Sequence, residues 1–200
     1  MDKRLIGLTG GIATGKTTVA NYLATAKNIP ILDADIYARD AVAIGSPILL
    51  AIAQRYGKHI LLPDGSLNRE QLGAIIFTQE DERQWVESLI HPYVVHRFQE
   101  AMVKSPSPTL VLVIPLLFEA QMTHLVTEIW VVRCSQLQQL QRLIQRNNLT
   151  PEQAQARINS QLSLEEKAAR ATVVLDNSST QESLCQQVDM ALAMSTTNKP

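Results

Sequence analysis

The chain has 200 residues, of which 46% are hydrophobic, and its 18 basic and 19 acidic residues give a net charge of -1. This size suits one domain or one domain with an insertion, and the balanced charge, without a block of Lys or Arg, argues against nucleic acid as a partner. Cys134 and Cys185 stand alone, no apolar run is long enough to span a membrane and no signal-like segment begins the chain, so we expect a cytoplasmic protein without disulfides, a zinc site or a membrane anchor.

The first predicted elements are a strand over residues 4–9 and a helix over residues 16–27, joined by a glycine-rich loop. The loop matches the pattern G-x-x-x-x-G-K-[ST]. In that pattern the glycines let backbone amides surround phosphates, the lysine reaches the β and γ phosphates, and the hydroxyl binds Mg²⁺. The predicted ATP-binding residues are Gly10, Gly11, Ile12, Ala13, Thr14, Gly15, Lys16, Thr17 and Thr18, with Lys16 also catalytic and Thr17 as the Mg²⁺ ligand.

A second strand, over residues 29–32, leads into a helix through Asp33 and Asp35. Ligands of parallel sheets gather outside the carboxyl ends of the strands. We therefore expect Asp33 to face the γ-phosphate and to accept a proton from an attacking hydroxyl group. The alternative is that these acids only cap the helix, as Asp35 in particular could.

Residues 46–105 are predicted to be helical throughout. One helix begins near Pro47 and stops at Gly57, and another is capped by Asn68. A long amphipathic helix over residues 80–102 contains His91-Pro92, and the proline should kink or interrupt it. A role for His91 in packing or in breaking the helix is at least as plausible as a role in binding.

Three more apolar strands follow, and a polar helical hairpin separates the last two. The hairpin breaks at Asn147-Asn148 and restarts at Thr150-Pro151. Uniformly apolar strands separated by helices favour a parallel sheet covered on both faces. The sequence thus predicts an α/β fold with five strands, of which the last three are residues 110–115, 128–134 and 172–178. Leu116 and Glu119 lie just beyond the end of the strand over residues 110–115.

Arg142 and Arg146 lie four residues apart on the first helix of the hairpin. A closing lid would bring such cations onto a transferring phosphoryl group. The alternative is a solvated helix face.

The motif alone does not define the type of nucleotide-binding protein. The chain lacks the Asn-Lys-x-Asp element of a GTPase, and the strand over residues 110–115 does not end in the acid of a motor or transport ATPase. These absences favour phosphoryl transfer to a small acceptor. A kinase of a nucleoside monophosphate or a sugar acid, and a non-catalytic nucleotide switch, remain open alternatives.

Several stretches together resemble the dephospho-CoA kinase family, in order from Leu5 to about Asn177: "GLTGGIATGKTT", "ILDADIYAR", "LNREQLGAIIF", "IHP", "IPLLFE" and "RLIQRNN...RINSQLS...K". The resemblance implies a P-loop kinase with a three-layer core (residues 1–45, 106–135 and 170–195), a helical acceptor-binding insertion (46–105) and a helical lid (136–169). It implies transfer of the γ-phosphoryl group of MgATP to the ribose 3'-hydroxyl of dephospho-CoA, giving CoA and ADP in the last step of coenzyme A synthesis.

Residue roles also follow from the resemblance. Gly11 to Thr17 would cradle ATP, Asp33 would be the base, and Arg142 or Arg146 the lid arginine. The candidate acceptor-binding residues are Asp35, Arg39, His91, Leu116 and Glu119. ATP and dephospho-CoA are the expected partners, and the protein is expected to be a monomer or a weak homo-oligomer.

The loop departs from the family pattern at two positions, where Ala13 and Thr14 replace a glycine and a serine. Alanine is strained at positive φ. The sequence therefore predicts that position 13 does not require a positive φ.

Overall fold

A computed structural model of the chain describes residues 3–194, which form two compact units. The first unit runs to residue 32 and resumes at residue 106, and the second comprises residues 33–105. The second unit thus begins at Asp33, whereas the sequence placed the start of the helical insertion near residue 46. The ends of the expected core, residues 1–2 and 195, lie outside the described residues.

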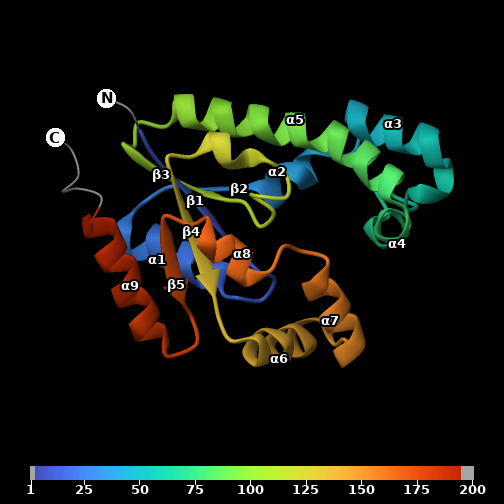
Figure 1. The fold of residues 1–200 in the computed structure, drawn as a ribbon. Helices are drawn as coiled ribbons and strands as arrows, with labels where there is room; N and C mark the ends of the chain where they lie inside the picture. The colour runs from blue at the N-terminus through green and yellow to red at the C-terminus, as the bar shows by residue number, and fades with distance from the viewer. Residues whose placement is uncertain (1–2, 195–200) are drawn as a thin grey trace. The chain divides into compact units, whose positions relative to one another are not determined.

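A five-stranded parallel sheet organises the first unit, in the order β2-β3-β1-β4-β5 (Figure 1). The prediction of five parallel strands in an α/β fold is confirmed. All five strands differ somewhat in extent from the prediction. The second is shifted toward Asp33 and the third ends before Ile114, while the first includes Gly10 and the last two are shorter than predicted. The strands are Arg4–Gly10 (β1), Ile31–Asp33 (β2), Thr109–Val113 (β3), Glu128–Arg133 (β4) and Val173–Asp176 (β5).

Two helices cover one face of the sheet: Lys16–Lys27 (α1) and Gln181–Met194 (α9) (Figure 1). Their apolar sides pack on alternate residues of the strands, which is the pattern that a strand with two covered faces requires. The shared core on this face includes Ile6, Leu8, Val19, Leu23, Trp130, Val132, Leu184 and Val188, each 1% exposed or less.

The segment that follows β3 covers the other face of β1. A Cβ placed on Gly7 of β1 would lie 3.0 Å from Val126 and 3.3 Å from Leu117, so the glycine lets this segment approach closely. The segment contains a short 3-10 helix, Met122–Leu125 (η2). Helix α8, Leu164–Ala169, packs against β4.

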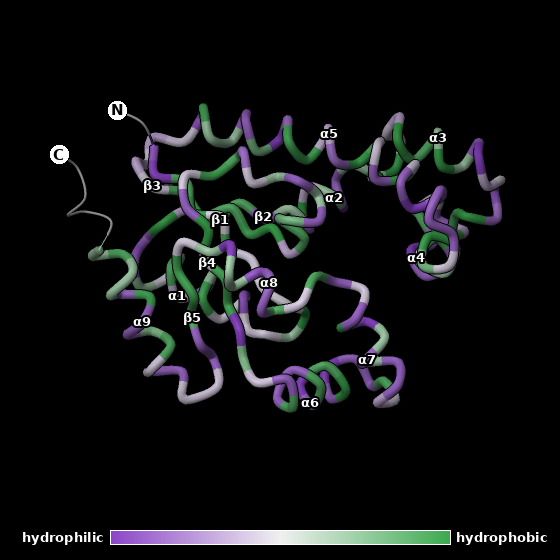
Figure 2. The backbone as a smooth tube through the Cα atoms, in the orientation of Figure 1, coloured by the Kyte–Doolittle hydropathy of each residue, from purple (hydrophilic) through white to green (hydrophobic). Residues whose placement is uncertain are grey.

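Helices α6 (Gln136–Asn147) and α7 (Pro151–Asn159) form the predicted hairpin. Asn148 ends α6 in the left-handed conformation, and the Thr150 side chain caps α7 with Pro151 in its first turn. The sequence predicted both boundaries. In Figure 2 these two helices alternate hydrophilic and hydrophobic residues, whereas the strands of the sheet are largely hydrophobic.

The second unit is helical and has its own hydrophobic core. Helix α3 begins at Pro47, Gly57 ends it, and Asn68 caps α4, as predicted; the structure adds Ser46 as the cap of α3. An isolated bridge joins Leu61 to Leu67. The helices are Ala34–Ala41 (α2), Pro47–Tyr56 (α3), Lys58–Ile60 (η1), Arg69–Thr78 (α4) and Glu80–Lys104 (α5), and the core includes Leu49, Ile52, Ile60, Leu67, Leu72 and Val86.

Helix α5 continues through Pro92 for 25 residues, so the proline does not interrupt it. Packing on both sides of the proline explains this continuity, because Val86 precedes it and Val94 and Phe98 follow it as buried residues. Tyr37 of α2 contacts the Phe98 ring edge-on, with 5.2 Å between centroids. Among the described residues, no helix combines the length and the apolar character needed to cross a membrane.

Candidate active site

The glycine-rich loop joins β1 to α1, and two glycines determine its shape. Gly10 and Gly15 have φ angles of 143° and 104°, which side chains disfavour. A Cβ on Gly10 would lie 2.2 Å from the Val132 carbonyl oxygen, and one on Gly15 would lie 2.1 Å from Nδ2 of Asn177. Helix α1 starts directly after Gly15 without a side-chain cap. Its amino end therefore suits an anionic group such as phosphate.

Ala13 also has a positive φ, 60°. The prediction that position 13 avoids this region is therefore wrong. Residues in this conformation persist when surrounding contacts impose it. Neighbouring Ile12 makes two such contacts, because Gln161 accepts a hydrogen bond from its N–H and Gln139 donates one to its carbonyl.

The Lys16 ammonium group lies across the loop. Its Nζ donates hydrogen bonds to the carbonyl oxygens of Gly10, at 3.1 Å, and Gly11, at 2.7 Å. Three donor positions on a flexible stem allow an ammonium group to exchange such carbonyls for phosphate oxygens. The lysine is thus positioned at the concave side of a loop that can hold phosphates.

Two threonines of the loop have opposite environments. Thr14 is fully buried, and its hydroxyl donates to the Gly11 carbonyl. Thr17, in the first turn of α1, is exposed. Mg²⁺ in nucleotide sites takes one or two protein oxygens and completes its shell with phosphates and water. The Thr17 hydroxyl fits that requirement, and the described residues contain no cluster of three His, Cys, Asp or Glu side chains that would form an all-protein site.

The two predicted arginines differ in their surroundings. Arg142 is half-buried and donates from Nη2 to the Asn177 carbonyl, while the Asn177 side chain donates to the Thr14 carbonyl of the loop. Nη1 of Arg142 is buried and makes no hydrogen bond of normal geometry, although the Cys134 thiol lies beside the guanidinium group. Burial raises the pKa of that thiol, and the arginine opposes the shift. Arg146 is exposed, and its Nε donates a hydrogen bond to the Asn147 side chain at 2.9 Å.

Two adjoining cavities have volumes of about 220 and 390 Å³; the first lies at the carboxyl ends of β4 and β5, and the second is lined mainly by residues of the helical segment 136–169, including Gln139 and Gln161, which contact the loop. The carboxyl ends of the strands are where a parallel sheet places its ligands, and the volumes suit parts of a small molecule. Both are lined by Cys134, Gln136, Leu164 and Glu165; the first adds Arg133, Ser135, Asp176 and Ser178, and the second adds Gln139, Ile158, Asn159, Gln161, Ser163 and Glu166.

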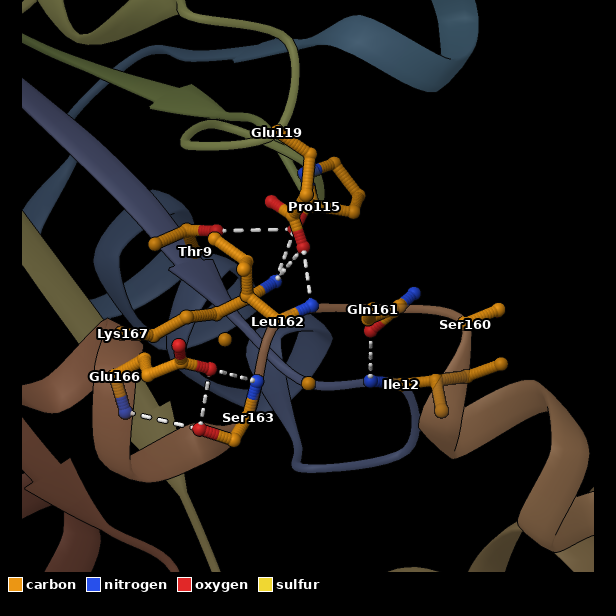
Figure 3. A network of polar contacts seen from close by, with 12 residues as sticks. Thr9, Ile12, Pro115, Glu119, Ser160, Gln161, Leu162, Ser163, Glu166 and Lys167 are labelled. Atoms are coloured by element: carbon orange, nitrogen blue, oxygen red, sulfur yellow. Dashed lines mark hydrogen bonds and ion pairs between the residues drawn. The ribbon is translucent and has the colours of Figure 1, made fainter. Parts of the chain in front are cut away.

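Glu119 lies beyond β3 and pairs with a buried lysine (Figure 3). Its Oε1 lies 2.8 Å from Nζ of Lys167, whose side chain is fully buried, and accepts a hydrogen bond from the Leu162 amide. Its Oε2 is buried and has no hydrogen-bond partner. Leu116, in the same segment, is 39% exposed.

The other predicted residues belong to the second unit. Asp33 caps α2, since its Oδ1 accepts the Asp35 amide at 2.8 Å; Asp33, rather than Asp35, is therefore the capping acid. Asp35 and Arg39 are exposed on α2, and His91 is half-buried on α5.

Sequence reasoning missed the glutamines that contact Ile12. Gln139 is 3% exposed and precedes the buried Leu143 by one helical turn. A polar residue in phase with the apolar side of a helix was the available signal.

The fold and the loop define an α/β P-loop kinase. A family model described as dephospho-CoA kinase matches residues 4–183. A dephospho-CoA kinase from Trichormus variabilis is 75% identical over 192 residues, covering 96% of this chain and 98% of the relative. The chain therefore belongs to the dephospho-CoA kinase family.

Solved structures agree with this assignment. The crystal structure of TT1252 from Thermus thermophilus superposes with a TM-score of 0.84 at 29% identity, covering 97% of this chain and 98% of that one. Dephospho-CoA kinase from Campylobacter jejuni gives a TM-score of 0.71 at 26% identity, covering 98% and 100%.

Proposed function

We propose that the protein carries out its family's reaction by direct transfer of the γ-phosphoryl group of ATP to the 3'-hydroxyl of the dephospho-CoA ribose, giving CoA and ADP. The observation that supports this most is the family match over residues 4–183, which includes the loop and the start of α1, where no side chain caps the helix. Transfer without a covalent intermediate requires positioning and charge stabilisation rather than a protein nucleophile.

Residues 10–18 hold the phosphates. The amino end of α1 and the amides of the loop face negative charge, and Lys16 moves from the Gly10 and Gly11 carbonyls to the β and γ phosphate oxygens. The Thr17 hydroxyl would hold Mg²⁺, which would supply positive charge that offsets the negative charge of the phosphates.

The arginines of α6 stabilise the charge of the transferring group. Arg142 already contacts Asn177 beside the loop and has an unsatisfied Nη1, which a nucleotide or phosphate oxygen would satisfy. Arg146 is exposed and can approach when residues 136–169 close as a lid. The adenosine part of ATP occupies the two adjoining cavities.

Asp33 orients the acceptor hydroxyl and takes its proton. Only one of its oxygens accepts the amide of α2, so the other remains for the hydroxyl. Dephospho-CoA binds through residues 46–105. The candidate contacts predicted from the sequence are Asp35, Arg39, His91, Leu116 and Glu119. The unsatisfied Oε2 of Glu119 supports its candidacy, because a donor from the acceptor would pair it.

We also expect the enzyme to work in the cytoplasm as a monomer or a weak homo-oligomer. Both cysteines are free, which agrees with a reducing compartment.

Replacing Asp33 by asparagine tests the reaction and the base together. Asparagine caps a helix as well as aspartate does, so D33N keeps the start of α2 while removing the carboxylate. We expect ADP release with dephospho-CoA to fall about 10²- to 10⁴-fold, with unchanged ATP affinity and melting temperature.

A panel of acceptors completes the test. The wild-type protein should release ADP with dephospho-CoA and not with AMP or gluconate; turnover only with one of the latter would overturn the acceptor. An active D33N variant would overturn the base. D33A, which loses the cap as well, shows what a purely structural defect does to the melting temperature.

A further inference from the structure

The connection between α7 and α8 reaches the phosphate-binding loop directly (Figure 3). Gln161, in this connection, accepts a hydrogen bond from the N–H of Ile12 at 3.0 Å. From the other side, Nε2 of Gln139 on α6 donates to the carbonyl of Ile12 at 2.9 Å. The two peptide groups of one loop residue are thus both held by side chains of the helical segment 136–169.

These contacts precede a residue in a disfavoured conformation. The carbonyl that Gln139 contacts belongs to the peptide bond between Ile12 and Ala13, and Ala13 has a φ of 60°. A non-glycine residue stays in this region when its surroundings determine the backbone on either side. The glutamines fix the orientation of both peptide groups immediately before Ala13.

The connection is itself anchored at consecutive residues. The Leu162 amide donates to Glu119, and Ser163 caps α8 together with Glu166. Glu119 pairs with Lys167, whose fully buried Nζ also donates to the Pro115 carbonyl at 3.3 Å. The Lys167 side chain is fully buried and that of Glu119 is 22% exposed, so separating the pair would leave an uncompensated charge at the buried lysine, which restricts the geometry of both partners. The residues that follow Gln161 are therefore held in place by these contacts.

Hydrogen bonds also connect the Glu119–Lys167 pair to β1, the strand that precedes the loop. The Pro115 carbonyl accepts a second hydrogen bond, at 3.1 Å, from the hydroxyl of Thr9, which directly precedes Gly10. The Glu119–Lys167 pair is thus linked to β1 through the Pro115 carbonyl. It is linked to Ile12, in the middle of the loop, through Leu162 and Gln161 (Figure 3).

We propose that Gln161 and Gln139 are positioning residues that hold the loop in its ATP-binding shape, with Ala13 at positive φ, so that the helical segment 136–169 sets the affinity for ATP. The inference rests on the proposed function only in taking this loop as the ATP site. It does not depend on which acceptor receives the phosphoryl group.

The test measures ATP affinity of the full chain by calorimetric titration with Mg²⁺ and no acceptor. Methionine replaces glutamine with similar volume but without the amide, and Q161M should weaken ATP binding about 3- to 10-fold, as expected for one lost hydrogen bond. Glycine adopts a positive φ freely, so adding A13G to Q161M should restore the affinity to within about 2-fold of A13G alone. Q141M, an exposed glutamine on α6, is the matched control and should leave affinity unchanged.

Three outcomes would overturn the proposal. Unchanged affinity in Q161M would remove the positioning role, and tighter binding would mean that Gln161 blocks a phosphate position. Weakening that A13G does not relieve would mean that the glutamine does not act through Ala13. If Q161M does not fold, the same comparison of ATP affinities is made with Q139M, with and without A13G. In turnover assays the KM for ATP should rise while kcat at saturating ATP stays, and lack of turnover with dephospho-CoA would count against the proposed function alone.

Discussion

At the scale of single residues, the glycines of positive φ fall into two kinds. Gly15 and Gly45 share this conformation, but a Cβ on Gly15 would collide with Asn177 whereas one on Gly45 would meet nothing within 4 Å. We expect G45A to lower stability by on the order of 1 kcal/mol through strain alone. G15A should cost at least about 2 kcal/mol and weaken ATP binding more than about tenfold. Chemical unfolding and ATP titration check both variants, and G15A binding ATP like the wild type would refute the steric argument.

Residue by residue, the sequence predicted what local chemistry decides. The motif identified Gly10 and Gly15, because their positive φ follows from the loop itself. Ala13 was predicted wrongly, because the propensity of alanine is overridden by Gln139 and Gln161, which are distant in sequence. The sequence shows at most a polar residue in phase with the apolar side of α6, at Gln139, and does not show what that residue contacts, so the interior of the site had to come from the structure.

At the scale of elements, helix boundaries were predictable wherever a side chain or glycine marks them. Asn68 and Thr150 cap helices as expected, and Gly57 ends one. The course of α5 through Pro92 was not predictable, because tertiary packing decides whether a proline ends a helix. Asp33 caps α2, which is the alternative that the sequence left open, and its role as the base stays a prediction.

Between α3 and α5, one carboxylate should make stability sensitive to acid. Arg55 and Tyr56 both donate hydrogen bonds to Glu82, which lowers the pKa of that carboxyl to about 2 from 4.5. A lowered pKa stabilises the fold above the unfolded value, and this stabilisation disappears as the pH falls from about 4.5 toward 2. E82Q should therefore lose less of its melting temperature than the wild type does between pH 6 and pH 3, as differential scanning calorimetry would measure.

The control for this prediction is D81N, at the neighbouring exposed position, which forms no ion pair with residues 3–194. D81N should follow the wild-type pH dependence. If E82Q and the wild type lost melting temperature in parallel, the network around Glu82 would not be a source of acid sensitivity.

At the scale of the whole molecule, two units with separate cores suggest separate effects of the two substrates. The loop, α6 and both cavities belong to the first unit, and the helices assigned to the acceptor belong to the second. A ligand stabilises what it binds, by about 2.7 kcal/mol at a concentration 100 times its Kd. In hydrogen–deuterium exchange, MgATP alone should slow exchange in residues 10–18 and 133–178, and dephospho-CoA with ADP should add protection within residues 33–105.

Adding the two substrates separately distinguishes the residues that each one protects. Hydrogen exchange slows where local opening of the fold requires more free energy. Each ligand should therefore slow exchange in the unit that it binds, even without turnover. The D33N variant allows both substrates to be present together, because it should consume them only slowly. With ATP it should show the protection of residues 10–18 and 133–178, and dephospho-CoA should add protection within residues 33–105. If dephospho-CoA protected only residues of the first unit, the helical region would not be the acceptor site, and Leu116 and Glu119 would become the main candidates for its contacts.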